Sequence, residues 1–151
     1  MSKHKKRRVR WVSSNPISIA ITGVRKLNDN ILSDLRLMEL SSIEAIASGK
    51  GGQHDLSLLA GMAKLTEILA DNGIGVEAKQ IAIDAQEALH SITERSDRLG
   101  KLGVSMAELD ALRTAFDAHD QQRQMVSHSA YEKFLKGLIN SFDSSVTSKY
   151  K

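Results

Sequence analysis

The spacing of the apolar residues is the feature of this sequence that most constrains its fold. From residue 27 onward they recur every three or four positions, and glycines at 49–52, 73–75 and 100–103 interrupt the pattern. This spacing gathers apolar side chains on one face of a helix, and glycines end helices. The sequence therefore predicts five principal helices, over about 28–48, 55–72, 76–99, 105–126 and 129–143.

Two start signals support these boundaries. Ser105 and Glu108 in "SMAE" form a capping box, in which each side chain bonds the other residue's backbone amide, and Ser129 and Glu132 in "SAYE" repeat the pattern. The connection between the last two helices is very short, and short connections join antiparallel neighbours. We therefore expect these two helices to form an antiparallel hairpin.

The predicted fold class is all-α: a single helical bundle with a C-terminal helical hairpin and a flexible basic N-terminal arm. A length of 151 residues fits one domain. We place the arm at 1–14, the helical domain at 15–144 and a frayed tail at 145–151. "NP" at Asn15–Pro16 also predicts a short helix from Pro16 to about Thr22, because proline suits the first position of a helix.

The composition excludes several classes of protein. The sequence has no cysteine, which excludes disulfides, thiolate metal sites and cysteine nucleophiles. No apolar run approaches the roughly 20 residues that a membrane-spanning helix requires. We expect a cytoplasmic protein without a membrane span, and the sequence leaves its oligomeric state open.

Positive charge is concentrated at the N-terminus. Residues 1–10 carry six of the 21 lysines and arginines and no acid, so the remainder has 15 basic against 18 acidic residues. Basic side chains neutralise phosphates, and an aromatic ring can stack on a base. The nucleic-acid-binding candidates are Lys3, Lys5, Lys6, Arg7, Arg8, Arg10 and Trp11. The alternative is that the extension only keeps the protein in solution.

The stretch "HDQQRQMVSHSAYEK", residues 119–133, crowds polar residues where the predicted helix over 105–126 ends. His119 and Arg123 are four apart on the face of Leu112 and Phe116, with Asp120 and Gln122 to either side. These four residues could line a pocket in which His119 transfers protons, or contact a partner. We favour a structural polar network, in which His119 and Arg123 bond carbonyls of the turn and of a neighbouring helix end.

Other candidate sites lack supporting residues. His90 and Glu94 have the spacing of a metal pair on one helix face, but the sequence places no third ligand beside them, so we expect an exposed pair. "GKGG" at 49–52 joins two helices and lacks the phosphate-loop pattern. The final helix is too apolar for the recognition helix of a helix-turn-helix. We predict no metal, no cofactor and no catalytic residue.

The segments "RRVRWVSSNPISIAI" and "FDAHDQQRQMVSHSAYEKFL" resemble those of small helical proteins, mostly without assigned function, from proteobacterial chromosomes and mobile elements. The resemblance implies a helical fold and a plasmid or phage setting, but no substrate or cofactor. We expect a non-enzymatic protein that binds a protein partner, as a regulator or inhibitor of a host or plasmid machine. The alternative is a nucleic-acid-binding accessory or regulatory protein that uses its basic arm.

Overall fold

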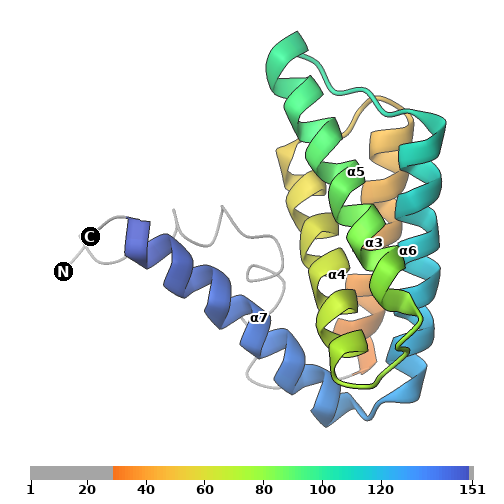
Figure 1. Cartoon of the computed structure of the whole chain (residues 1–151), viewed down its shortest axis with the longest axis vertical. Coiled ribbons are helices and arrows are strands. Elements are labelled where there is room, and N and C mark those ends of the chain that lie inside the picture. The colour runs from red at the N-terminus through yellow and green to blue at the C-terminus, as the bar shows by residue number, and fades with distance from the viewer. Residues whose placement is uncertain (1–28, 150–151) are drawn as a thin grey trace.

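The computed structural model describes residues 29–149, and within them the side chains of residues 32–141. This part of the chain is all α-helical and contains no strand, as the sequence predicts (Figure 1). The expected helix from Pro16 to Thr22 lies outside the described residues. The five helices are α3 (Asp29–Ala47), α4 (Gln53–Asp71), α5 (Ala78–Leu99), α6 (Met106–Met125) and α7 (His128–Lys149).

Local signals in the sequence account for the observed helix ends. At the start of α6, Ser105 Oγ accepts from the Glu108 amide at 3.2 Å, and the Glu108 carboxylate accepts from the Ser105 amide at 2.8 Å. This is the predicted capping box. α3 and α5 are each followed by glycines with positive φ, Gly49 at 77° and Gly100 at 75°. Glycine adopts this conformation without a steric penalty, so the chain reverses there.

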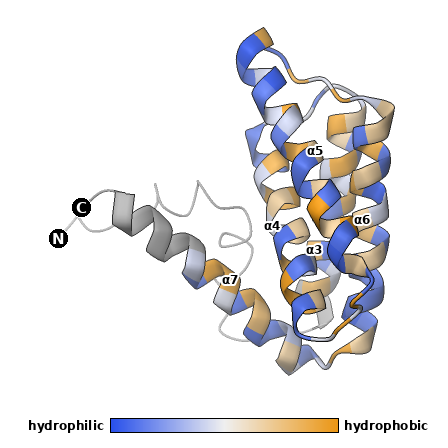
Figure 2. Ribbon diagram, viewed as in Figure 1, coloured by the Kyte–Doolittle hydropathy of each residue, from blue (hydrophilic) through white to orange (hydrophobic). Residues whose placement is uncertain are grey.

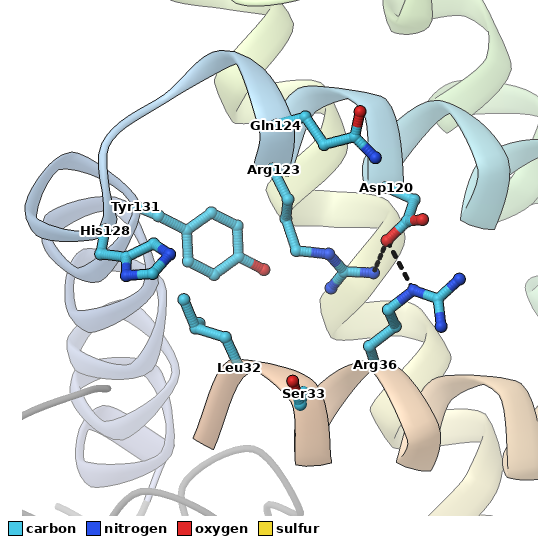
Figure 3. A pocket seen from close by; sticks show the side chains of 8 residues that line it. All are labelled: Leu32, Ser33, Arg36, Asp120, Arg123, Gln124, His128 and Tyr131. Atoms are coloured by element: carbon cyan, nitrogen blue, oxygen red, sulfur yellow. Dashed lines mark hydrogen bonds and ion pairs between the residues drawn. The ribbon is translucent and has the colours of Figure 1, made fainter. Parts of the chain in front are cut away.

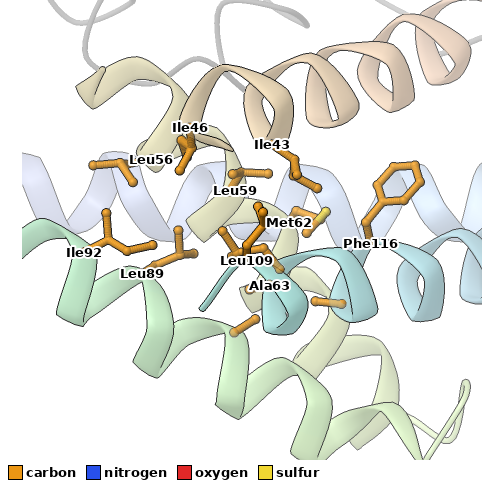
Figure 4. Packing of buried hydrophobic residues seen from close by; sticks show 13 residues of the cluster. Ile43, Ile46, Leu56, Leu59, Met62, Ala63, Leu89, Ile92, Leu109 and Phe116 are labelled. Atoms are coloured by element: carbon orange, nitrogen blue, oxygen red, sulfur yellow. The ribbon is translucent and has the colours of Figure 1, made fainter. Parts of the chain in front are cut away.

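α4 is the central helix, and it packs against each of the other four. Its sequence is apolar on most sides, with ten buried residues, which suits a helix surrounded by others. α3, α5 and α6 surround its first half and share one hydrophobic cluster with it (Figure 4). Ile46, Leu59, Ile92 and Leu112, one from each helix, are fully buried there. Shortening such a residue to alanine typically costs about 2–5 kcal/mol.

α7 forms a second hydrophobic cluster with α3 and α4. Tyr131, Leu135 and Leu138 are buried against apolar residues of these helices, including Leu35 and Leu69. Figure 2 shows hydrophobic residues on the part of α7 nearest the bundle. Toward its C-terminal end α7 diverges from the other four helices (Figure 1). The predicted hairpin is therefore open, because α7 packs mainly against α4 and not along α6.

Two boundary predictions for α7 need correction. The helix begins at His128, so the residue that caps it is Ser127, whose Oγ accepts from the Ala130 amide at 3.2 Å, and not Ser129. The expected frayed tail at 145–151 is helical as far as Lys149. No glycine or proline interrupts residues 140–149. A helix that has already formed adds one hydrogen bond for each further residue, so it continues although few apolar residues follow Phe142.

No helix in the described residues is both long and apolar enough to cross a membrane.

Candidate groove between α3, α6 and α7

An open groove lies where the start of α3, the end of α6 and the start of α7 converge (Figure 3). Its volume is about 490 Å³. Three helices supply its walls, so its shape depends on how α7 is held against the bundle. The lining residues are Leu32, Ser33, Arg36, Asp120, Arg123, Gln124, His128 and Tyr131.

Polar side chains from the last turns of α6 point in two directions. His119 and Gln122 are buried inside the bundle, at 0% and 1% exposure, whereas Asp120 and Arg123 line the groove. The structure therefore divides the four residues that the sequence singled out into two clusters. We call Thr66, His119, Gln122 and Tyr131 the inner cluster, and Arg36, Glu39, Asp120 and Arg123 the arginine cluster.

Gln122 fixes the geometry of the inner cluster. Its Nε2 donates to two backbone carbonyl oxygens, of Thr66 at 3.0 Å and of Ile74 at 2.9 Å. The Ile74 carbonyl belongs to the turn between α4 and α5. In the same turn, a Cβ on Gly75 would lie 3.0 Å from Gln122 Cγ, and Gly75 has a φ of 62°. Two features therefore favour glycine at position 75. Its backbone conformation is strained for other residues, and Gln122 lies too close to leave room for a Cβ.

The partners of His119 determine its tautomer. The amide nitrogen of Gln122 donates to two carbonyls, so its oxygen Oε1 faces His119 and accepts from Nδ1 at 3.2 Å. Thr66 Oγ1, which donates to the Met62 carbonyl, also lies 3.0 Å from Nδ1. Nδ1 thus carries the proton, and Nε2 accepts from the Tyr131 hydroxyl at 2.8 Å. His119 joins α4, α6 and α7 through these bonds.

Burial keeps the inner cluster uncharged. Burial, together with the positive charge of Arg123, lowers the pKa of His119 to about 3. Burial also raises the pKa of Tyr131 above its usual value. His119 is wholly enclosed and both of its ring nitrogens are bonded, so it has no access to a molecule in the groove.

Arg123 and Glu39 form the buried part of the arginine cluster. Arg123 Nη2 and Nη1 bond the two Glu39 oxygens at 2.8 and 3.1 Å, and the side chains are only 10% and 6% exposed. Burial raises the pKa of Glu39 and the charge of Arg123 opposes that rise. Both carboxylate oxygens accept from the guanidinium, so the pair is ionised. Arg123 Nε is buried without a hydrogen-bond partner.

Arg36 and Asp120 form the exposed part of the arginine cluster. Arg36 Nε donates to Asp120 Oδ1 at 2.9 Å, and the side chains are 45% and 23% exposed. Arg123 Nη2 reaches the same Asp120 oxygen at 3.4 Å. Both guanidiniums lie over the Phe116 ring, with centroid distances of 5.4 Å for Arg36 and 5.8 Å for Arg123. Each arginine of the groove thus has a carboxylate partner.

The observed partners differ from those expected from the sequence. Gln122, and not His119 or Arg123, bonds the carbonyls, because His119 meets side chains and Arg123 meets carboxylates. Local sequence patterns do not mark Arg36, Glu39, Thr66 or Tyr131 as members of a site. Glu39 carried a signal, since it occupies the helical spacing of the apolar residues Leu35, Ile43 and Ile46. A charged residue on such a face requires a buried partner.

The remaining candidates lie elsewhere. His90 Nε2 and Glu94 Oε1 are 3.2 Å apart on α5, with side chains 74% and 70% exposed, as expected for a surface pair. Within the described residues no group of three or more histidines and acids could hold a metal ion. The arm candidates from Lys3 to Trp11 lie outside the described residues.

Comparison of the chain with protein-family models, with curated proteins and with solved structures found no match.

Proposed function

We propose that this chain is a non-enzymatic, cytoplasmic binding protein that contacts a protein partner through the groove between α3, α6 and α7. The observation that carries this proposal is the groove itself, open to solvent and held in shape by a fully bonded inner cluster. The polar side chains of the groove are held in position before a partner binds, which lowers the entropic cost of binding. In a plasmid or phage setting, such a protein would regulate or inhibit a host machine.

Charge favours a protein partner over nucleic acid at this surface. Arg123 is paired with Glu39, and Arg36 with Asp120, so the groove presents polar groups with little net positive charge. Residues 29–149 contain 12 lysines and arginines against 18 aspartates and glutamates, a net charge of −6. Phosphate backbones bind to basic faces. The alternative, a nucleic-acid-binding accessory protein, depends on the six basic residues at positions 1–10.

A pull-down from host lysate, divided into nuclease-treated and untreated halves, tests the proposal. The full chain is compared with Arg36→Ala and with Arg113→Ala. Arg113 is a matched control because it also pairs across α3 and α6, with Glu44 at 3.1 Å, and its side chain is 46% exposed. Unlike Arg36, Arg113 is outside the groove lining.

We expect a discrete partner protein that survives nuclease, is retained by Arg113→Ala and is lost with Arg36→Ala. Recovery that disappears with nuclease would favour the arm and nucleic acid. Equal retention by both variants would place the partner elsewhere on the protein.

A further inference from the structure

A second groove lies farther along α7, between that helix, α4 and α5, with a volume of about 440 Å³. Its apolar lining includes Leu56 and Ala60 of α4, Leu89 of α5 and Leu138 of α7. Lys64 and His90 are the charged or titratable residues of the lining, which contains no acid. Lys64 already pairs with Glu67 and His90 with Glu94, so the groove offers an incoming helix its apolar lining and not a free positive charge.

The chain itself has a matching segment in the distal part of α7. The buried residues Tyr131, Leu135 and Leu138 follow one another at helical spacing. In the sequence, Phe142 and Val146 continue that spacing, and Asp143 is the only charged residue between Lys136 and Lys149. α7 is helical to Lys149, and it diverges from the bundle along this part of its length (Figure 1). Because the helix is continuous, its distal part cannot turn back into its own groove.

We infer that a second copy of this chain inserts its distal α7 into the groove between α4, α5 and α7, in a reciprocal dimer. Each copy contributes one helix and accepts one, so the same surface serves both copies and the assembly closes at two. The apolar spacing of the helix matches the apolar lining of the groove. This surface is distinct from the groove that we propose for a protein partner.

The test measures the mass of the full-length protein in solution by light scattering and by sedimentation velocity. Val146→Asp places a charge on the apolar spacing of distal α7. Ser144→Asp is the matched control, because it adds the same charge two positions away, roughly 200° around the helix. Ser57→Glu blocks the groove, since Ser57 lines it between Leu56 and Ala60.

The wild-type chain and Ser144→Asp should form dimers, whereas Val146→Asp and Ser57→Glu should each raise the dimer dissociation constant by at least about tenfold. Mixing these two variants provides the decisive result. The intact groove of Val146→Asp can accept the intact helix of Ser57→Glu, so a heterodimer keeps one undamaged contact and the mixture should associate more tightly than either variant alone. Circular dichroism melting of each variant verifies that it is folded.

Three results would overturn the inference. One is a wild-type chain that stays monomeric over the concentration range tested, and another is an equal effect of Ser144→Asp and Val146→Asp. The third is a mixture of Val146→Asp and Ser57→Glu that associates no more tightly than either variant alone although both are folded.

Discussion

The inner cluster and the arginine cluster arise from the same two turns of α6, but they use different chemistry. The inner cluster is buried, with only Tyr131 reaching the groove, and it consists of neutral groups whose donors and acceptors are matched. The arginine cluster is charged, and exposure rises from the Arg123–Glu39 pair to the Arg36–Asp120 pair. Burying a charge costs far more than burying a bonded neutral group, so charges are placed nearer the solvent.

The largest loss of stability is expected at the buried ion pair of Arg123 and Glu39, because its charges are the farthest from solvent. Glu39→Ala leaves the Arg123 guanidinium, whose side chain is 10% exposed, without its bidentate partner. Removing one member of a buried pair typically costs about 3–5 kcal/mol. Chemical denaturation should show a loss of this size. A loss below about 1 kcal/mol would mean that water reaches Arg123, and the difference between its environment and that of Arg36 would disappear.

Measuring the free energy of unfolding as a function of pH tests whether the inner cluster is uncharged. The His119 pKa is about 3 in the folded protein, against about 6.5 in an unfolded chain. Between these values the unfolded state binds the extra proton, so stability falls as the pH falls. For this group the slope is about 1.4 kcal/mol per pH unit.

The slope is measured by denaturation at a series of pH values, with His119→Gln as the control. The contribution of Glu39, whose raised pKa acts in the opposite sense, is common to both proteins and cancels in the difference. Identical pH profiles for the wild type and the variant would show that His119 is not held neutral.

A smaller effect is expected from Tyr131→Phe, which keeps the buried ring and removes only the hydroxyl that donates to His119 Nε2. An acceptor left unbonded in the interior costs about 1–3 kcal/mol. Because this bond links α6 to α7, hydrogen exchange should accelerate more in α7 than in α5. Uniform acceleration across all helices would indicate that the hydroxyl has no particular role in holding α7.

The smallest effect is expected at the exposed end of the arginine cluster. Arg36→Ala removes an ion pair whose arginine is 45% exposed, and such pairs contribute about 0–1 kcal/mol because water screens them. Arg113→Ala, with a similar exposure of 46%, should change the melting temperature by a similar amount. A much larger loss for Arg36→Ala would show that the Arg36–Asp120 pair supports the fold as the buried pair does.

Much of the fold followed from local sequence patterns. The helices near 28–48, 76–99 and 105–126 match α3, α5 and α6 within two residues, because glycines and the Ser105–Glu108 capping box act over only a few residues. The start and end of α7 were less well predicted. Two serines compete for its cap, and Val146 alone keeps the apolar spacing in residues 144–149, which is too little to predict a helix.

The sequence by itself determined that His119, Asp120, Gln122 and Arg123 form a polar group at the end of an amphipathic helix. Tertiary structure decided which of them face inward, because one helical turn cannot specify what approaches it from α3, α4 and α7. Glu39 and Thr66 are 84 and 53 residues distant from their partners Arg123 and His119. Likewise, α7 lies against α4 and not along α6 because its apolar residues complete a surface that only the assembled α3 and α4 provide.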